Sequence, residues 1–122
     1  MTIQEIISVE ESNRDKIFLY KEGIFLKAYD RSAFLFFYYI KNYAIKSKYY
    51  KNVNLQVRSL GFPASSFDTV LRNRFSYSHE ENKIVISDIE PIDLDDYELW
   101  TKETGEKPIE KYLKVIYKAK KL

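Results

Sequence analysis

The sequence predicts a mixed α/β fold, in which a central mixed β-sheet carries an N-terminal hairpin and is flanked by helices. Residues 17–21 and 24–29 are rich in aromatic and β-branched side chains and only two residues separate them, which favours a β-hairpin. Residues 33–40 are eight consecutive apolar residues, and their Asp-Arg-Ser lead-in favours a buried helix over a strand. Residues 53–58 alternate apolar and polar side chains, as a strand with one wet face does.

The first half of the chain supplies local signals for each element. Thr2 and Glu5 have the spacing of a capping box and predict a short helix that ends near Asn13. The hairpin is expected to turn at Glu22 and Gly23, where glycine provides the positive φ of a tight turn. Asp30 is expected to be the N-cap of the apolar helix, which is predicted to extend through residues 43–45.

The second half is more polar and its elements are shorter. Residues 60–63, Leu-Gly-Phe-Pro, are predicted to end the strand, and residues 65–68 carry a second capping signal for a helix that runs to Phe75. A polar turn over 78–83 leads to a strand at 84–86, and a short helix is expected over 94–100. Residues 108–121 begin with Pro108 and end in lysines. This pattern predicts a C-terminal helix, because proline suits the first helical position and positive charges at the C-terminal end interact favourably with the helix dipole.

Length and composition predict one domain spanning residues 1–122. The chain is long enough to bury a core without metals or disulfides, and it has no cysteine. Its first residues do not form a basic segment followed by an apolar run, and its longest apolar run is far too short to cross a membrane. A cytoplasmic protein without a membrane segment or a cofactor is therefore expected.

Charge is unevenly distributed although the net charge is only +2. Residues 41–74 contain seven basic residues and a single acidic one, Asp68, whereas residues 80–106 are strongly acidic. A basic flank of this kind could bind a polyanion, and the opposite flank could meet a protein of complementary charge. The alternative is a solvated surface whose patches have no partner.

Two segments resemble a known module. Residues 18–33, FLYKEGIFLKAYDRSA, resemble the aromatic-Tyr-basic-x-Gly-x-Phe-x-x-x-aromatic-x-x-x-Ala signature of the N-terminal mismatch-recognition domain, domain I, of the MutS mismatch-repair proteins. Gly61-Phe62-Pro63, followed by the predicted helix, resembles the Gly-aliphatic-Pro segment of the same domain. The resemblance covers about residues 2–90 and leaves the acidic segment and the C-terminal helix, 91–122, outside it. It implies a sheet flanked by helices.

The resemblance also implies a function. In the MutS family this domain presents a Phe that wedges beside a mismatched base, and a Glu two residues later that forms a hydrogen bond to the base. Phe25 occupies the Phe position, but Lys27 occupies the Glu position, and lysine only donates and favours phosphate. Stand-alone proteins similar to this domain accompany the reverse transcriptase of bacterial diversity-generating retroelements. The resemblance therefore implies an accessory module that binds nucleic acid without full mismatch recognition and has a possible reverse transcriptase partner.

The residues themselves suggest the same ligand class. Basic side chains interleaved with tyrosines suit nucleic acid, because bases stack on rings and phosphates attract cations. On this basis Lys21, Tyr20 and Tyr29 could line the surface beside Phe25 and Lys27. The run from Lys46 to Lys51 is either a phosphate contact or a solvated loop, and Phe25 either stacks on a base or packs within the fold. The predicted nucleic-acid-binding residues are Phe25, Lys27, Lys46, Lys48 and Lys51.

Other functional classes have weaker support. His79 is the chain's single histidine and lies in a turn signal, so no acid–base pair, catalytic residue or metal site is expected. The acidic run from Asp93 to Glu98 lacks the glycine and final glutamate of a calcium loop. An enzyme is therefore not expected. The alternative function is a protein-interaction module that docks through the acidic segment and Trp100 or through a Tyr-rich face. Ligand form, DNA or RNA and single-stranded or duplex, and oligomeric state stay open.

Overall fold

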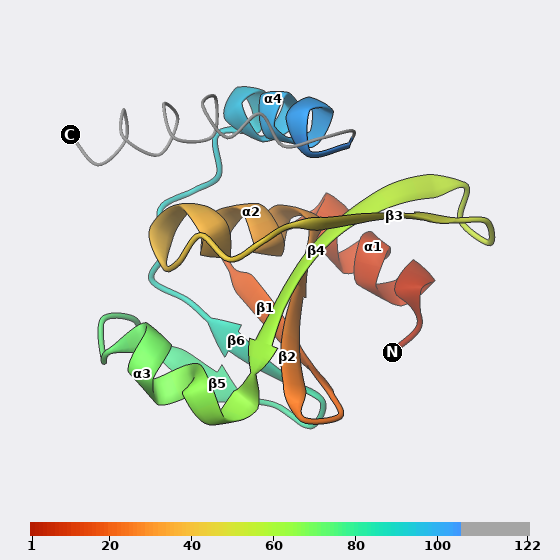
Figure 1. Ribbon diagram of the computed structural model, residues 1–122. Coiled ribbons are helices and arrows are strands. Elements are labelled where there is room, and N and C mark those ends of the chain that lie inside the picture. Colours follow the sequence, from red (N-terminus) through yellow and green to blue (C-terminus); the bar gives the residue numbers. More distant parts are fainter. Residues whose placement is uncertain (106–122) are drawn as a thin grey trace.

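The computed structural model describes residues 1–105, which fold into helices packed on both faces of one β-sheet (Figure 1). The expected C-terminal helix over 108–121 lies outside these residues. The helices are α1 (Ile3–Glu11), α2 (Asp30–Tyr39), the 3₁₀ turn η1 (Ala64–Ser66), α3 (Phe67–Leu71) and α4 (Leu94–Gly105). The strands are β1 (Ile17–Glu22), β2 (Phe25–Tyr29), β3 (Lys46–Tyr50), β4 (Leu55–Pro63), β5 (Tyr77–His79) and β6 (Lys83–Ile86).

The six strands form one sheet in the order β3-β4-β2-β1-β6-β5. The predicted α/β class is confirmed, but the sheet does not mix strand directions, because all its pairings within residues 1–105 are antiparallel. The hairpin of β1 and β2 forms the centre. β4 pairs with β2, and the short edge strands β3 and β5 complete the two sides.

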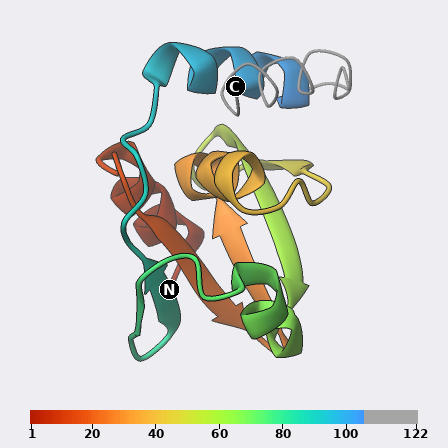
Figure 2. The same cartoon turned by 90° about the vertical axis from the view of Figure 1, so that its left-hand side faces the viewer.

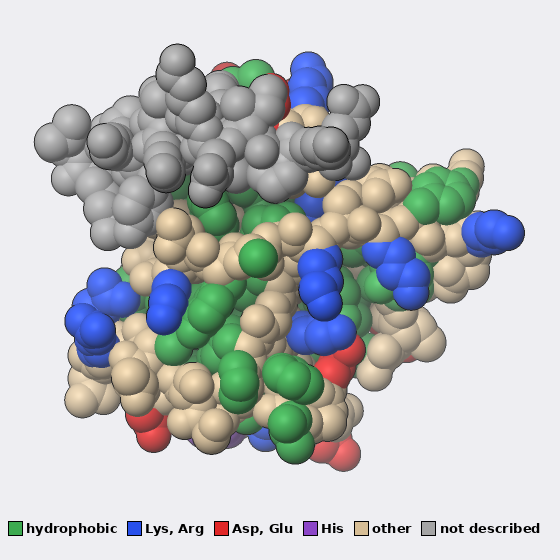
Figure 3. Space-filling view, in the orientation of Figure 1, with side chains coloured by type: hydrophobic (Ala, Val, Ile, Leu, Met, Phe, Trp, Pro, Cys, Tyr) green, Lys and Arg blue, Asp and Glu red, His purple; other side chains and the backbone are tan. Residues whose placement is uncertain are grey.

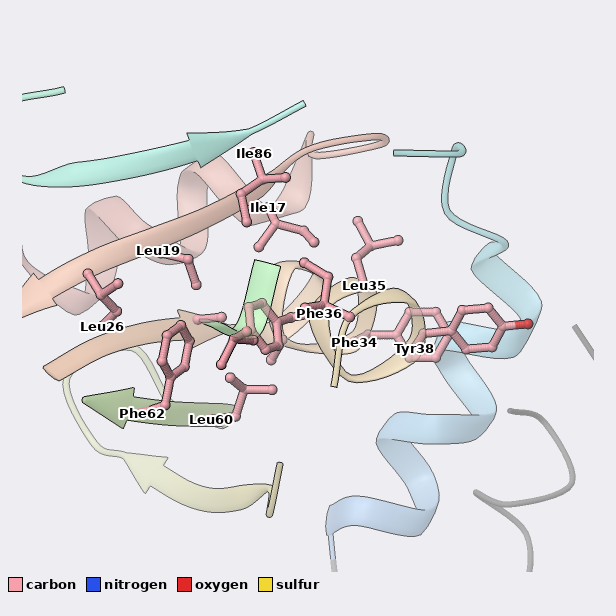
Figure 4. Close-up of a cluster of buried hydrophobic side chains, with 14 of the residues drawn as sticks. Ile17, Leu19, Leu26, Phe34, Leu35, Phe36, Tyr38, Leu60, Phe62 and Ile86 are labelled. Carbon is pink, nitrogen blue, oxygen red and sulfur yellow. The ribbon is translucent and has the colours of Figure 1, made fainter. Parts of the chain in front are cut away.

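One face of the sheet, here called the core face, carries the main hydrophobic core. Side chains at alternate positions of β1, β2, β4 and β6 point into it, and α2 covers them (Figure 4). The alternation of Ile24, Leu26 and Ala28 with polar and aromatic neighbours predicts that these three side chains face the core. Leu26 and Ala28 are buried there, but the prediction is wrong for Ile24, which lies in the hairpin loop and is 73% exposed. Phe36 from α2 stacks on Phe62 from β4 with ring centroids 5.1 Å apart. The apolar helix is thus the most buried one, because both the sheet and α4 lie against it.

α4 forms a further layer, packed on α2 and on strands β4 and β3 (Figures 1 and 2). Trp100 is fully buried, with its ring centroid 5.4 Å from that of Phe34 and 5.9 Å from that of Tyr97. Arg58 of β4 donates from Nη2 to the carbonyl oxygen of Thr101 at 2.6 Å. The prediction that Trp100 could serve as a docking residue is therefore wrong, because its ring is part of the core.

The opposite face, here called the open face, is only partly covered. Ile6 and Ile7 of α1 pack on Tyr20, Tyr29 and Val57 and form a second, smaller core. The capping box that begins α1 is confirmed: the Glu5 N–H donates to Thr2 Oγ1, and the Glu5 carboxylate accepts from the Thr2 N–H. The rest of the open face, toward β3 and the tip of the hairpin, is free of α1 and carries exposed side chains.

A buried carboxylate joins α1 to α2. Glu10 is 2% exposed, and its two oxygens accept from the Ser32 N–H at 2.7 Å and from Ser32 Oγ at 2.6 Å. Ser32 Oγ in turn accepts from the Phe18 N–H at 3.0 Å. Burial raises the pKa of the Glu10 carboxyl to about 7, against the lowering effect of hydrogen bonds from Ser32 and Asn13. Glu10 of α1 thus provides a hydrogen-bond acceptor for a backbone N–H in the first turn of α2, which has no partner within its own helix.

Two predictions for the hairpin region need correction. The turn lies one residue later than expected, since Glu22 pairs with Phe25 and leaves Gly23 and Ile24 as the two-residue loop. Gly23 has the positive φ expected of it, +59°. Asp30 does not cap α2, because it is the first helical residue and its carboxylate accepts from the Arg58 N–H at 3.0 Å.

The remaining corrections concern strand and helix ends. Residues 46–50 form the edge strand β3 and not a loop, and β4 continues through Gly61 and Phe62 to Pro63 because β2 pairs with it there. Residues 77–79, which overlap the expected polar turn, form β5, and β6 confirms the strand at 84–86. α2 ends at Tyr39, before residues 43–45, and α3 ends at Leu71, before Phe75. No side-chain hydrogen bond caps α3 within the described chain.

No helix within residues 1–105 has the length and apolar character needed to cross a membrane.

Candidate nucleic-acid interface

Four of the five predicted site residues share one face of the sheet. In the antiparallel register Phe25 lies opposite Pro63, and Lys27 lies opposite Gly61. Lys46 and Lys48 lie opposite Ser59 and Val57, which are two and four residues from Gly61 on the same strand. Since side chains of directly opposed residues point to the same side, all four project from the open face. Lys51, the fifth, follows in the turn after β3 and is exposed.

Phe25 lies at the tip of the hairpin and is accessible. Its side chain is 43% exposed, and the neighbouring Ile24 is 73% exposed. The tip is fixed to the start of η1, because the Ala64 N–H donates to the Ile24 carbonyl oxygen at 2.8 Å. Phe25 therefore does not pack inside the fold, and its ring can meet a ligand.

Lys27 has an acidic neighbour on the same face. Its Nζ lies 3.5 Å from Oε1 of Glu22, and both side chains are about 40% exposed. The other Glu22 oxygen accepts a hydrogen bond from the Tyr29 hydroxyl. Burial raises the pKa of Tyr29, and the Glu22 carboxylate raises it further. Glu22 thus holds the head group of Lys27 near the tip of the hairpin.

The lysines of β3 extend this cationic surface away from the hairpin. Lys46 and Lys48 are exposed, and Nζ of Lys48 lies 4.9 Å from the centroid of the Tyr50 ring, within cation–π range. In the space-filling view, which has the orientation of Figure 1, several Lys and Arg side chains lie over the region of β3 and β4, and hydrophobic side chains lie near the ends of β2 and β4 (Figure 3). We call Phe25, Lys27, Lys46, Lys48 and Lys51 the cationic surface.

A groove crosses the cationic surface. Its volume is about 360 Å³, and its lining includes Phe25, Lys27, Tyr43, Lys46 and Gly61. Apolar rings and lysines therefore line the same hollow. It lies where β4 has passed the end of β3 and pairs only with β2 among the described strands.

Three other residues proposed for this surface do not join it. Tyr20 and Tyr29 are 3% and 6% exposed, because α1 covers them. Lys21 alternates with Tyr20 along β1 and so projects toward the core face, where it is exposed and lines, together with Phe25, a second hollow at the tip of the hairpin. The expectation of an exposed nucleic-acid surface is therefore wrong for Tyr20 and Tyr29, whereas Lys21 lies near Phe25 on the other side of the hairpin.

The sequence did not indicate Tyr43, Gly61 or Glu22 as site residues. Tyr43 follows α2, where the sequence predicts more helix, and Gly61 lies in the segment that is predicted to end the strand. Glu22 was expected in the turn, but the strand pairing places its carboxylate beside Lys27. The residue spacing from Glu22 to Lys27 across a two-residue loop would have indicated this contact.

Acidic residues and His79 form no cation site in the described part of the chain. No group of three or more His, Asp or Glu side chains there is arranged to hold a metal ion. Asp93 caps α4 instead, because its Oδ1 accepts from the Asp96 N–H at 3.0 Å. His79 is exposed at the end of β5, where its ring meets that of Tyr77.

Comparison with known proteins gives no assignment: no protein-family model matches this chain, and neither a curated protein nor a solved structure shows significant similarity to it.

Proposed function

We propose that this protein is a non-catalytic module that binds nucleic acid through the cationic surface. The observation that carries the proposal is the register of β2, β4 and β3, which gathers Phe25, Lys27, Lys46 and Lys48 on one open face. Lysines beside an accessible aromatic ring can contact both parts of a nucleic acid, since lysine attracts phosphate groups and bases stack on aromatic rings.

The resemblance of residues 18–33 to the MutS mismatch-recognition domain supports the same ligand class. The presence of Lys27 in place of the glutamate favours contacts with the backbone over reading of a mismatched pair. An accessory role beside a reverse transcriptase fits a small module of this kind, and that enzyme is the protein partner we propose. The acidic segment supports a separate docking function less well, because Trp100 is buried.

Charge reversal tests the proposal. A variant with Lys46→Glu, Lys48→Glu and Lys51→Glu should lose binding to labelled oligo(dT) and oligo(U), because three phosphate contacts become repulsive. For the unmodified protein, the logarithm of affinity should fall linearly with the logarithm of salt concentration, with a slope of about −0.7 per phosphate contacted on a single strand. Fluorescence anisotropy over a salt series measures both.

The matched control carries the same change in charge elsewhere. Lys16→Glu, Arg72→Glu and Lys102→Glu replace exposed basic residues that lie outside the cationic surface. This variant should retain most of the affinity. Binding that is absent in the unmodified protein, independent of salt, or lost equally in both variants would overturn the proposal.

A further inference from the structure

A side chain at position 61 would crowd the floor of the groove. Gly61 lies opposite Lys27, and a Cβ at position 61 would be 3.2 Å from Cγ of Lys27 and 3.5 Å from the carbonyl oxygen of Leu26. The stem of Lys27 also passes close at Cε, 3.7 Å from the same point. The absent side chain therefore lets the lysine stem lie across β4, so that the Lys27 stem and the Gly61 backbone together form the floor.

Conformation does not explain this glycine. In the described chain Gly23 is the glycine with a positive φ, whereas Gly61 has an ordinary strand backbone that any residue adopts. A glycine inside a strand weakens the strand, and it often marks a place where a ligand comes close to the backbone. Space, not backbone freedom, is what Gly61 provides.

One wall of the groove is held by the core. The Tyr43 ring stacks on the buried Phe62 ring, with ring centroids 5.4 Å apart and an angle of 8° between the planes. It also stacks on the Phe36 ring, with centroids 6.1 Å apart. Phe25 and Lys27 line the groove from β2, and Lys46 lines it from β3. One wall is therefore fixed before any ligand arrives, which lowers the ordering cost of binding.

The shape and charge of the groove select one form of nucleic acid. A hollow of about 360 Å³ is near the lower end of the range for small-molecule sites, about 300–1,000 Å³. Bases inside a duplex are stacked and paired, so they do not enter a hollow, whereas an unpaired base can splay out and stack on a ring. The lysines that line the groove match the phosphates before and after such a base.

From these features, and resting on the proposed function, we infer that the groove takes one unpaired base of a single strand, with Gly61 in its floor and Phe25 as its stacking partner. The protein therefore prefers single strands, or unpaired positions in a structured RNA or DNA, to a regular duplex. Lys46, Lys48 and Lys51 guide the backbone that leads to the groove.

Filling the floor tests the inference. Gly61→Val places a branched side chain in the groove and displaces the Lys27 stem, while valine suits a strand. The probes are labelled oligo(dT), an abasic phosphodeoxyribose strand of equal length, and a duplex that contains the same oligo(dT). The unmodified protein should bind oligo(dT) more tightly than the abasic strand by about five- to 150-fold, the range for one stacked base. Gly61→Val should remove that difference and keep the abasic affinity within about threefold.

Two further variants keep the test decisive. Gly61→Ala adds only the Cβ and supplies a milder version if valine disturbs the fold, which thermal unfolding would reveal. Ser78→Val adds the same side chain to β5, at the far edge of the same sheet face, and should leave all three affinities unchanged. Equal binding of oligo(dT) and the abasic strand, or tighter binding of the duplex, would overturn the inference and leave the proposed function intact. Failure to bind any of the three would overturn both.

Discussion

At the scale of single residues, Glu22 acts against the proposed ligand. Its carboxylate lies 3.5 Å from the Lys27 amine, so a phosphate must compete with it for the cation. The Tyr29 hydroxyl also donates to Glu22. Glutamine keeps an acceptor oxygen for that hydroxyl but loses the charge.

Glu22→Gln should therefore bind oligo(dT) more tightly. The gain should be about 1.4- to fivefold at low salt, as expected from an exposed ion pair worth about 0.2–1 kcal/mol. It should shrink as salt rises, because both contacts are accessible to solvent. Glu81→Gln, an exposed change in the turn between β5 and β6, is the control. Weaker binding by the Glu22 variant would show that the carboxylate positions Lys27 for the ligand.

A second residue, Glu10, makes the stability of the fold depend on pH. Burial raises its pKa from the ordinary 4.5 to about 7, so the folded state holds the proton more tightly than the unfolded chain. Its contribution is fully present below pH 4.5 and is lost as pH rises toward 7. Each pKa unit corresponds to about 1.4 kcal/mol, so the loss is on the order of 3 kcal/mol.

Glu10→Gln should flatten this dependence. Urea unfolding at a series of pH values between 4.5 and 7 should give a free energy of unfolding that falls less steeply with pH than that of the unmodified protein. Glu11→Gln, at the exposed neighbouring position, should leave the slope unchanged. Equal slopes for the unmodified protein and the Glu10 variant would show that Glu10 is ionised in the folded state throughout this range.

At the scale of elements, β3 differs from the central strands. It is an edge strand that pairs only with β4 among the described strands, and none of its five residues is fully buried. Lysines on an edge strand also discourage pairing with another sheet. We expect β3 to open more readily than β1 and β2, because few apolar contacts hold it.

Amide hydrogen exchange would measure this. Amides of β3 should exchange faster than those of β1, β2 and β6, and oligo(dT) at saturating concentration should slow them, because bound phosphates hold Lys46 and Lys48. The control is β5, the other edge strand, whose exchange should not respond to oligo(dT). Exchange in β3 as slow as in β1 would contradict the expectation of a weakly held edge.

The elements also show which signals in the sequence were sufficient. The hairpin was predictable because Leu26 and Ala28 alternate with Phe25 and Lys27, and the structure buries the first pair. β3 was not predictable, because a strand with both faces wet has no apolar period. The continuation of β4 through Gly61 to Pro63 depends on pairing with β2, which lies far away in the sequence, and the local signal for a stop was overruled by it.

At the scale of the molecule, the sequence indicated the fold class and the cationic residues, but not how they combine. Phe25, Lys27, Lys46 and Lys48 were identified as single candidates, and the sheet register brought them together. The acidic composition of its segment suggests that Trp100 lies at the surface, whereas its ring is buried. The spacing of Tyr97, Trp100 and Thr104 marks one stripe of a helix, and the burial of Trp100 and Thr104 follows it.

The position of Trp100 has a practical consequence for spectroscopy. It is the chain's single tryptophan, and it lies in the α2–α4 layer, on the opposite side of the sheet from the cationic surface. Its emission therefore reports whether the protein is folded, without direct contact with a ligand on the open face. A single cuvette can thus separate a variant that has lost its ligand, whose emission stays blue-shifted, from one that has lost its structure, whose emission shifts to the red.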